Sequence, residues 1–359
     1  MKIAHVIGAR PNFMKAAPVV RALLPLVVQR LIHTGQHYDR AMSEVFFTEL
    51  GLPTPDVNLG VGSGSHAAQT AQVMLQFERS LIAERPDWII VYGDVNSTLA
   101  AALVGSKLGI PVAHVEAGLR SYDRTMPEEV NRVLTDQVAE LLFTSEEQGA
   151  PNLRREGVAD AKIHFVGNVM IDTLVRLLPE AERRPLPLPL GHVPFVLVTL
   201  HRAGNVDHRD TLTEIVAALG QLAGDELEIV FPIHPRTRAR LVDWQLLQEL
   251  SCCRIAEPLG YLDFLALQMR AALVLTDSGG VQEETAYLGV PCLTLRPNTE
   301  RPATIVYGRN RLIPGERQAI VAGVKRVLDD SIAAKPPSIP LWDGHAAERI
   351  AAVFARLAA

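Results

Sequence analysis

The feature that most constrains the fold is a regular alternation of short apolar runs, turns and helical patterns along the chain. Runs such as Trp88–Tyr92 and Phe195–Thr199 are apolar at almost every position, which is typical of strands buried on both faces of a parallel sheet. Between such runs, Ser97–Leu108 has a helical pattern that we expect the Ser97 hydroxyl to cap and that ends before Gly109. This alternation predicts a doubly wound α/β fold with right-handed crossovers. The predicted strands are Lys2–Ile7, Gln29–His33, Trp88–Tyr92, Val112–Val115, Leu141–Thr144, Ile163–Val166, Phe195–Thr199, Glu228–Pro232, Cys253–Ile255, Leu273–Thr276 and Pro291–Thr294.

The length of 359 residues exceeds what one hydrophobic core usually supports, and it predicts two domains. The clearest break in the pattern is Arg184–Gly191, because its prolines remove amide donors and disfavour helix in the residues before them. This segment separates two halves of similar size. The preceding residues, Asn168–Glu182, have the pattern of a helix that bridges the halves.

Composition and charge exclude several functional classes. Hydrophobic residues make up 48% of the chain, enough for two cores, and the net charge of −5 gives no sign of a nucleic-acid-binding protein. Met1–Ile7 reads as a strand without the long apolar region of a signal peptide, and no apolar run is long enough to span a bilayer. The three cysteines have neither metal-ligand spacing nor a disulfide framework. We therefore expect a cytoplasmic globular protein with no nucleic-acid or membrane partner.

Three acidic residues stand where a reaction centre is expected. Asp94 and Glu116 each follow a predicted buried strand, and Glu128 opens a predicted helix in which Pro127 is the first residue. In an open α/β sheet, ligands bind beyond the carboxyl ends of the strands. This arrangement indicates proton-transfer chemistry, although helix capping and solvation of loops explain a single acidic residue equally well. For Arg132, an ordinary helix pair with Glu128 is a fair alternative to a role in the site.

Basic residues follow other predicted strands. Arg10 and Lys15 come after the first strand and a glycine turn, which favours phosphate or pyrophosphate binding over an ordinary surface position. His201 and His234 follow two strands of the second half, but no third or fourth ligand accompanies them at zinc-site spacing. We therefore expect imidazoles that donate hydrogen bonds or protons, and no metal site.

The sequence predicts a phosphate site most clearly in the turn that begins at Asp277. A strand stops at Thr276, and Ser278, Gly279 and Gly280 lead into a helix, where backbone amides and the helix dipole favour a negative charge. Glu284 lies further along this helix, within reach of two ribose hydroxyls. The alternative is a plain tight turn with an aspartate cap, and the spacing of a Walker loop is absent.

In this order, these motifs resemble those of the non-hydrolysing UDP-N-acetylglucosamine 2-epimerases. The matches run through nearly the whole chain, and their number and order make the resemblance specific where any single one would not. The matching motifs are Gly8–Pro11 with Lys15, His33–His37, Gly93–Thr98, His114–Arg120, Pro127–Arg132, Gly167–Asn168, Thr199–Arg202, His234–Arg236, Asp277–Glu284 and Thr299–Pro302.

The resemblance implies two Rossmann-like domains that face each other across a cleft, as in the GT-B class of glycosyltransferases. The first domain, residues 1–168, would carry the catalytic carboxylates, and the second, residues 169–344, would bind UDP. A C-terminal helix, residues 345–359, would return to the first domain. The resemblance also implies a homodimer that interconverts UDP-N-acetylglucosamine and UDP-N-acetylmannosamine without a metal or a nicotinamide cofactor, and so supplies precursors of surface polysaccharides.

Similar enzymes eliminate UDP to form 2-acetamidoglucal and then add UDP back with the opposite configuration at C2. Because the C2 proton is weakly acidic, a positioned carboxylate with a tuned pKa must remove it, and a second acid must return a proton from the other face. Which carboxylate removes the proton and which donates it is left open. By the resemblance, the proton-transfer group comprises Asp94, Glu116 and Glu128, with Arg132 and His201 in support.

The resemblance also implies which residues bind the substrate. Cations and backbone amides would stabilise the charge that develops on the departing UDP, and Glu284 would hold the ribose. Phe264 and Arg301 would lie near the nucleotide. The residues implied in substrate binding are Arg10, Lys15, His201, Phe264, Ser278, Gly279, Gly280, Glu284 and Arg301.

Several alternatives remain open at the level of the sequence. The segment Gly35–Asp39, followed by Met42–Phe47, looks closer to relatives that act on a 3-acetamido uronic-acid UDP-sugar, or to epimerases of uncertain allostery. The substituents at C3 and C6 and activation by substrate are therefore undecided. A hydrolysing epimerase and a GT-B glycosyltransferase are the other enzymatic alternatives, and a non-catalytic nucleotide-sugar-binding protein is the most distant one.

Overall fold

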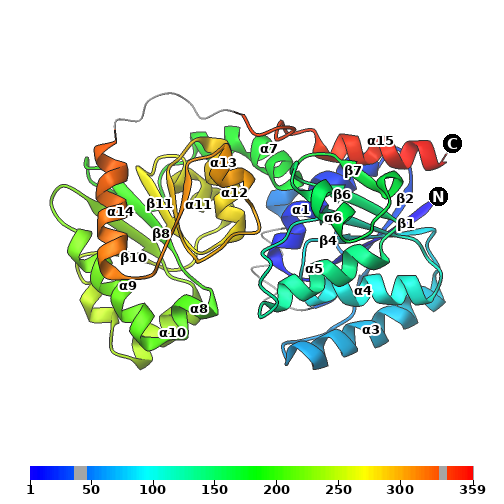
Figure 1. Ribbon diagram of the computed structural model, residues 1–359, viewed down its shortest axis with the longest axis horizontal. Helices are drawn as coiled ribbons and strands as arrows, with labels where there is room; N and C mark the ends of the chain where they lie inside the picture. Colours follow the sequence, from blue (N-terminus) through cyan, green and yellow to red (C-terminus); the bar gives the residue numbers. More distant parts are fainter. Residues whose placement is uncertain (36–46, 331–337, 359) are drawn as a thin grey trace. The chain divides into compact units, whose positions relative to one another are not determined.

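The computed structural model describes residues 1–35, 47–330 and 338–358, apart from the side chain of Arg10. Figure 1 shows two sets of parallel strands, each flanked by helices. Because the strands of both sheets pair in parallel, the predicted doubly wound α/β class is confirmed.

The chain divides into two compact units. Unit 1 comprises Met1–Arg176 and Pro340–Ala359, and unit 2 comprises Leu177–Ile339. The division falls inside helix α7 (Val169–Arg183), later than the boundary that the resemblance implies after residue 168.

Unit 1 is built on a seven-stranded sheet with the order β3-β2-β1-β4-β5-β6-β7. Its register is regular, with Ile3 opposite Gln29 on one side of β1 and opposite Trp88 on the other. The sequence pattern did not predict β3, because two residues are too few to produce a period. The strands are β1 (Lys2–Ile7), β2 (Val28–His33), β3 (Val57–Asn58), β4 (Trp88–Tyr92), β5 (Val112–Ala117), β6 (Leu141–Thr144) and β7 (Ile163–Phe165).

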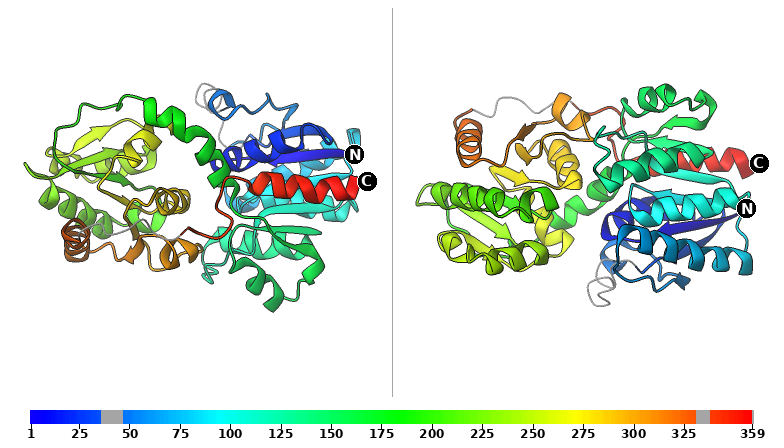
Figure 2. Two further views of the ribbon diagram at one scale, coloured as in Figure 1. Left: turned by 90° about the horizontal axis from the view of Figure 1, so that it is seen from above. Right: turned by 60° about the horizontal axis from the view of Figure 1, so that its bottom comes forward.

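Helices cover both faces of this sheet (Figures 1 and 2). On one face lie α3 (His66–Ala83), α4 (Asn96–Lys107) and α5 (Pro127–Val138); on the other, α1 (Arg10–Leu23) packs against α15 (Ala346–Ala358). The Phe354 ring of α15 lies 5.6 Å from the Trp88 ring, between centroids. The C-terminal helix therefore belongs to unit 1. The short helices α6 (Gly149–Arg155) and η1 (Asp160–Lys162) lie between β6 and β7.

The start of α4 differs from the prediction. The helix begins at Asn96, and its N-cap is Val95, which makes no side-chain capping bond. The Ser97 hydroxyl lies 2.7 Å from the hydroxyl of Thr34 instead. The predicted hydroxyl cap is therefore wrong, because Ser97 hydrogen-bonds across the unit rather than within its own helix.

Unit 2 is built on a six-stranded sheet with the order β10-β9-β8-β11-β12-β13. The polar start of β13 hid it from the sequence pattern, and β10 and β12 are each shifted by one residue from the prediction. The strands are β8 (Phe195–Thr199), β9 (Glu228–Pro232), β10 (Arg254–Ala256), β11 (Leu273–Thr276), β12 (Cys292–Leu295) and β13 (Asn310–Ile313).

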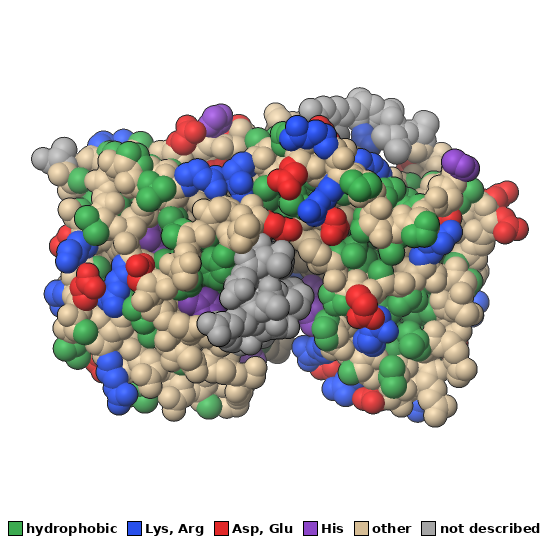
Figure 3. All heavy atoms as spheres, turned by 180° about the vertical axis from the view of Figure 1, so that it is seen from behind, with side chains coloured by type: hydrophobic (Ala, Val, Ile, Leu, Met, Phe, Trp, Pro, Cys, Tyr) green, Lys and Arg blue, Asp and Glu red, His purple; other side chains and the backbone are tan. Residues whose placement is uncertain are grey.

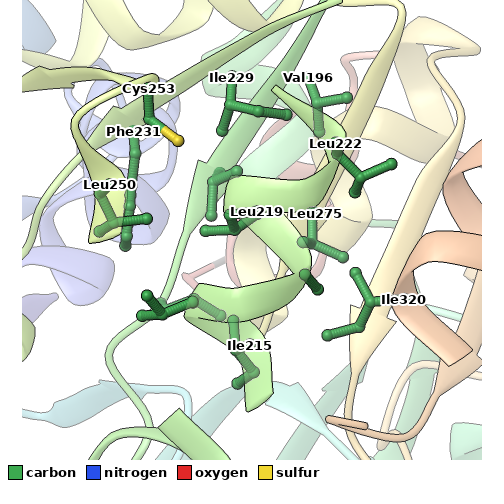
Figure 4. Close-up of a cluster of buried hydrophobic side chains, with 14 of the residues drawn as sticks. Val196, Ile215, Leu219, Leu222, Ile229, Phe231, Leu250, Cys253, Leu275 and Ile320 are labelled. Atoms are coloured by element: carbon green, nitrogen blue, oxygen red, sulfur yellow. The ribbon is translucent and has the colours of Figure 1, made fainter. Parts of the chain in front are cut away.

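The largest core of unit 2 lies between its sheet and two long helices. Figure 4 shows Leu219 of α9 (Arg209–Leu222) and Ile320 of α14 (Arg317–Asp329) pointing toward the strand side chains, such as Val196 and Leu275. All four side chains are fully buried. The other helices are α8 (Ala203–Val206), α10 (Pro235–Asp243), η2 (Leu247–Leu250), α11 (Tyr261–Gln268), α12 (Gly279–Leu288) and α13 (Ala303–Val306).

The proline-rich segment Arg184–Gly191 lies within unit 2, so it is not the break between the two units. Its leucines, Leu186, Leu188 and Leu190, pack against a buried cluster that includes Phe195. Residues two apart in an extended chain lie on the same side, which explains why alternating leucines reach one core. The expectation from proline alone was therefore wrong.

The surface carries mixed charges. On the face drawn in Figure 3, basic and acidic side chains are interspersed among hydrophobic and polar ones. Among the helices in residues 1–35, 47–330 and 338–358, none is both long enough and apolar enough to cross a membrane.

Candidate active site

Both sheets reverse their direction of growth at one pair of strands, and most of the predicted site residues lie there. The reversal lies between β1 and β4 in unit 1 and between β8 and β11 in unit 2. Open parallel sheets bind ligands beyond the carboxyl ends of the strands at such a switch point. The turns after these strands are therefore candidate sites, one in each unit.

In unit 1, Asn12 connects the first turn of α1 to the end of β4. Its side-chain oxygen accepts hydrogen bonds from the amides of Gly8 and Ala9, each at 3.1 Å. Its side-chain nitrogen donates to the carbonyl of Tyr92 at 2.8 Å. This buried amide holds α1 against β4, so that Lys15, one turn further along α1, lies beside the strand end.

Glu116 has the most unusual environment in unit 1. Its φ of 75° is in the left-handed region, and the register of β5 shifts between Val115 and Ala117. Its carboxylate forms an ion pair with the Lys15 ammonium, and both side chains are buried. A bulky residue in this backbone conformation costs about 1–3 kcal/mol, and burying two charges has a further desolvation cost. Costs of this kind concentrate at functional sites.

Gly93 leaves the space that this ion pair occupies. Its φ is 63°, and a Cβ at this position would lie 2.6 Å from the Lys15 ammonium and 3.3 Å from a Glu116 carboxylate oxygen. Both the backbone conformation and the space therefore require glycine here.

Asp94 follows directly and pairs with Arg132 of α5. The guanidinium donates to one Asp94 oxygen from Nε at 3.0 Å and from Nη2 at 2.6 Å, and the Asp94 side chain is 24% exposed. The third guanidinium nitrogen, Nη1, donates to Glu129 at 2.6 Å. Glu129 is buried and also accepts hydrogen bonds from Ser121 and Tyr122. Glu129 thus orients Arg132, a role that we had not predicted for it.

Glu128, the predicted partner in proton transfer, is half-buried in the first turn of α5. Among the described residues it makes no hydrogen bond or ion pair, so the alternative of an ordinary helix pair with Arg132 does not hold. The chain therefore places adjacent glutamates in two environments, one half-exposed and one buried and held by hydrogen bonds.

This difference leads to a paired prediction for Glu128→Gln and Glu129→Gln. We expect the first to lower kcat while the melting temperature changes little, because the Glu128 carboxylate makes no hydrogen bond or ion pair with the described residues. We expect the second to destabilise the protein by roughly 3–5 kcal/mol, because it removes the buried partner of Arg132. Thermal unfolding and steady-state rates on the same preparations test both, and equal melting temperatures for the two variants would contradict this assignment.

In unit 2, Asp277 is fully buried and connects the turns after β11 and β8. Its carboxylate accepts hydrogen bonds from the amides of His201, at 3.1 Å, and Arg202, at 3.0 Å. It also accepts one from Asn205 at 3.1 Å. Asp277 is therefore not a simple cap of its own turn, because it holds the His201 turn in place.

The His201 ring lies at this turn, with Nδ1 3.2 Å from Asp277 and its centroid 5.7 Å from that of His234. Burial lowers the pKa of His201, the charge of Asp277 raises it, and the cations Arg202, Arg236 and Arg296 lower it again, with a net decrease. A neutral imidazole can donate or accept a proton near neutral pH. His234 caps α10 by accepting from the Arg236 amide at 3.2 Å.

A cluster of arginines lies beside the predicted phosphate turn. Arg202, Arg296 and Arg301 all pair with the buried Glu300: the Arg296 distance is 2.6 Å, and that of Arg202 is 3.6 Å. Arg301 also pairs with Glu283 at 2.9 Å. Three cations thus share two carboxylates, which leaves an excess positive charge suited to an anion.

This cluster approaches the N-terminus of α12. A Cβ on Gly279 would lie 2.7 Å from the Arg301 guanidinium. Ser278 is the N-cap and makes no capping bond, so its hydroxyl does not occupy the first amides of the helix. Amides at a helix start, together with adjacent arginines, form an anion site of the kind that binds phosphate.

Glu284 lies further along α12, in a buried position. Tyr261 donates to one of its oxygens at 2.9 Å, and Gln268, with its amide oriented toward the carboxylate, donates to the other at 3.0 Å. The pKa of Glu284 is raised to about 7, because burial and the charge of Glu283 raise it by more than the hydrogen bonds from Tyr261 and Gln268 lower it. A ligand hydroxyl that donates to Glu284 would favour its ionised form.

A raised pKa predicts a stability that depends on pH. Below pH 4.5, the ordinary pKa, Glu284 is protonated in both the folded and the unfolded protein. As the pH rises from 4.5 to about 7, the unfolded chain releases this proton while the folded protein keeps it, so the free energy of unfolding falls. The full shift corresponds to about 3 kcal/mol. We expect Glu284→Gln to remove this decrease, measured as melting temperatures between pH 4.5 and 8. The exposed Glu226→Gln is the control, and an unchanged pH dependence in Glu284→Gln would contradict the prediction.

The remaining predicted residues have simpler surroundings. Phe264 of α11 is half-buried against the second core of unit 2. Arg10 is the first residue of α1, and its side chain lies outside the described residues, as do all of Gln36–Asp39 and Met42. Within the described ranges, no group of three or more His, Cys, Asp or Glu side chains is arranged to hold a metal ion.

Known proteins are similar to this chain in sequence and in fold. A family profile described as UDP-N-acetylglucosamine 2-epimerase matches residues 25–355. The chain belongs to the UDP-N-acetylglucosamine 2-epimerase family. The UDP-N-acetylglucosamine 2-epimerase of Methanocaldococcus jannaschii is 43% identical to it over 99% of both chains. The crystal structure of the M. jannaschii enzyme in complex with UDP-GlcNAc and UDP has a TM-score of 0.90 at 42% identity, covering 99% of this chain and 100% of that one.

Two other relatives bear on substrate and fold. The UDP-2,3-diacetamido-2,3-dideoxy-D-glucuronate 2-epimerase of Pseudomonas aeruginosa is 42% identical, over 99% of this chain and 100% of its own. A spinosyn rhamnosyltransferase shares 17% identity at a TM-score of 0.56, over 100% of this chain and 99% of that one, and shows the fold alone. The predicted family is therefore confirmed, and its fold extends to glycosyltransferases.

In this member of the epimerase family, the residues that the sequence reasoning missed are those that orient others. Asn12, Glu129 and Glu300 are buried and hold Tyr92, Arg132 and the arginine cluster, respectively. Glu129 and Glu300 stand beside residues that we had singled out, but a sequence does not reveal which of two adjacent polar side chains faces inward. The one available signal was helical spacing, since Glu129 and Arg132 are three residues apart.

Proposed function

We propose that this chain catalyses the reversible C2 epimerisation of UDP-N-acetylglucosamine to UDP-N-acetylmannosamine. The observation that carries the proposal is the environment of Glu116, a carboxylate in a left-handed backbone conformation beside a buried lysine, in the β5 turn next to Asp94. The fold accepts strain and buried charge there, which a structural role does not require. The names of the M. jannaschii relative and of the family support the same reaction.

The proposed reaction passes through an elimination. A base removes the C2 proton, the electron pair of the C–H bond forms a C1–C2 double bond, and the C1–O bond breaks to release UDP. The products of this step are 2-acetamidoglucal and UDP. In the reverse sense, an acid delivers a proton to the other face of C2 while the UDP oxygen forms a bond to C1. Two proton-transfer groups with different environments are therefore required.

The carboxylates of unit 1 meet this requirement. Asp94 is paired with Arg132, Glu116 is paired with Lys15, and Glu128 has a half-exposed position. The three carboxylates therefore differ in their charged partners and in their exposure. We assign proton transfer to these three residues, with Arg132 and His201 in support.

The anion site of unit 2 suits the diphosphate of UDP. We propose that the amides of Ser278–Gly280 at the start of α12, together with Arg301, bind phosphate oxygens. We propose in addition that Glu284 accepts hydrogen bonds from ribose. Arg10 and Lys15 are assigned to the same substrate from unit 1, and Phe264 to the nucleotide. Stabilised charge on the diphosphate makes UDP a better leaving group.

A second candidate is the same epimerisation of a UDP-sugar with a 3-acetamido group and a C6 carboxylate. The specific support is the 42% identity to the P. aeruginosa enzyme named for UDP-2,3-diacetamido-2,3-dideoxy-D-glucuronate, close to that of the M. jannaschii relative. The two candidates share the chemistry at C2 and differ only in the groups recognised at C3 and C6.

One experiment tests these functions. The protein is incubated in deuterium oxide with UDP-N-acetylglucosamine, and in parallel with the 3-acetamido uronate analogue, and the sugars are followed by proton NMR. Deuterium at C2 of intact UDP-sugar in both configurations supports epimerisation, and the faster substrate identifies the candidate. Release of free hexosamine with UDP would indicate a hydrolysing enzyme instead. No exchange with either sugar would reject the proposed chemistry.

We also propose that the protein acts as a homodimer. Apolar side chains gather on α3 and α5, where a groove of about 440 Å³ is lined in part by Met74, Pro127 and Val130. Ile82 and Leu134 are exposed on the same helices, at 73% and 44%. A second copy would bury these side chains. Sedimentation equilibrium tests this, with Leu134→Glu expected to shift the protein toward the monomer.

Finally, we propose that the enzyme works in the cytoplasm and supplies precursors of surface polysaccharides. All three of its cysteines are free thiols, Cys253 and Cys292 being buried, which suits a reducing compartment. Loss of surface polysaccharide in a deletion strain, restored by the chain without any export signal, is the expected result.

A further inference from the structure

A chain of buried charged groups lies behind the Glu116 turn. His114 of β5 and Asp136 of α5 are both fully buried, with Nδ1 of the histidine 2.6 Å from Asp136. Arg120 donates to the other Asp136 oxygen at 2.7 Å and also to Glu156 at 2.6 Å. None of these residues was assigned a role in the reaction described above.

This chain contacts the backbone of both turns that carry the reaction group. Nε2 of His114 lies 2.8 Å from the carbonyl oxygen of Gly93, the residue before Asp94. The Gly118 amide donates to Asp136 at 3.1 Å, and Gly118 lies two residues after Glu116. The histidine and the aspartate thus connect the Asp94 turn to the Glu116 turn through one short hydrogen-bonded link.

Both connected turns contain residues with positive φ angles. Gly93, Glu116 and Gly118 have φ values of 63°, 75° and 79°. A strained segment persists only where its surroundings over-determine it. The contact to the Gly93 carbonyl constrains the backbone directly before Asp94, and the contact from the Gly118 amide constrains the backbone two residues after Glu116.

The charges in this chain reinforce its geometry. Burial alone would raise the pKa of Asp136, but the charges and hydrogen bonds of His114 and Arg120 lower it below the ordinary value. An ionised Asp136 accepts hydrogen bonds, and so does the Gly93 carbonyl. The two ring nitrogens of His114 thus each face an acceptor, one on Asp136 and one on Gly93.

We infer that His114 and Asp136 form a positioning pair that sets the separation of the Asp94 and Glu116 carboxylates. The inference rests on the proposed function, because it concerns how the same site is held for proton transfer. The pair touches backbone rather than substrate, so it acts through the turns. Proton transfer requires the acid and the base within hydrogen-bond reach of C2, and small displacements of a catalytic group cause large losses of rate.

The competing explanation is an ordinary buried ion pair that serves stability alone. Apolar replacement of such a pair is often neutral or stabilising, and a structural role would lower the melting temperature without a selective effect on the chemical step. His5 provides a matched control: it is also a fully buried strand histidine in unit 1, and its Nδ1 lies 2.7 Å from the Tyr92 hydroxyl rather than from a site turn.

The test compares His114→Phe, His114→Gln and His5→Phe with the wild type. Glutamine can retain the donor to Gly93 but not the one to Asp136, whereas phenylalanine loses both. We expect kcat to fall about 10–100-fold in His114→Phe, as for other residues that orient catalytic groups, and less in His114→Gln. KM and UDP affinity should change less than about threefold, and His5→Phe should keep the wild-type kcat.

A readout that needs no substrate accompanies the rates. Hydrogen–deuterium exchange of residues 115–119 should be faster in both His114 variants and unchanged in His5→Phe. Full kcat in a folded His114→Phe, or equal losses in His5→Phe, would overturn the inference. If His114→Phe does not fold, His114→Gln decides by the same criteria. If the wild type incorporates no deuterium at C2 of the sugar, the proposed function is rejected. Separately, if amide hydrogen–deuterium exchange of residues 115–119 is the same in the His114 variants as in the wild type, the positioning pair is rejected.

Discussion

Glu116→Gln should lower kcat for C2 exchange by about 10²–10⁴-fold, the usual contribution of a general acid or base. Glutamine has nearly the same shape but neither accepts nor delivers a proton at this site. The affinity for UDP, measured by titration calorimetry, should remain largely unchanged, because the anion site of unit 2 is untouched. Full activity of the variant would remove Glu116 from the reaction group.

The same substitution leaves the Lys15 charge buried without its partner, so a loss of activity needs a control for stability. Removing one member of a buried ion pair typically costs about 3–5 kcal/mol, while replacing both members is much less harmful. We therefore expect Glu116→Gln with Lys15→Met to recover much of the stability in denaturant unfolding, and none of the activity. Recovery of activity along with stability would mean that Glu116 has a structural role only.

Arg301→Lys should weaken UDP binding by about 10–100-fold, equivalent to about 1.5–3 kcal/mol for a charge-assisted hydrogen bond. Lysine keeps the charge but not the planar fork, which in arginine pairs with Glu283 and Glu300 beside the start of α12. Titration calorimetry measures the affinity directly. The change should appear in KM and in the UDP dissociation constant more than in kcat.

The matched control is Arg311→Lys in the same unit. Arg311 is 54% exposed and pairs with Asp330 at 3.5 Å, a surface contact worth little. We expect its UDP affinity to equal that of the wild type. If Arg301→Lys also bound UDP as tightly as the wild type, the arginine cluster would not be the diphosphate site.

The repeated apolar runs were enough to predict the fold class, because strands buried on both faces leave a pattern that is visible locally. Strands without that pattern were not predicted: β3 has only two residues, and β13 begins at the polar Asn310. The prolines of Arg184–Gly191 predicted a break between two halves, and this was wrong because the leucines between them pack into a core of unit 2 whose other members are distant in sequence.

Within the candidate site, glycine turns and charged residues after strands were recognisable from their order alone. Their pairings were not. Arg132 had a local candidate partner in Glu128, but it pairs with Glu129 and with Asp94, which is contributed by a different strand end. Lys15 was expected to bind phosphate, and its ion pair with Glu116 depends on the approach of α1 to β5.

By itself, the sequence determined the α/β class and the family, and it predicted the turns to which we assign the reaction, since each of these depends on residue types in a local order. Only the tertiary structure decided which neighbour of a pair is buried, which charges meet, and that His114 and Asp136 connect the turns of Gly93 and Gly118. These outcomes depend on the distances between strand ends far apart in the chain. A short-range pattern contains no information about such distances.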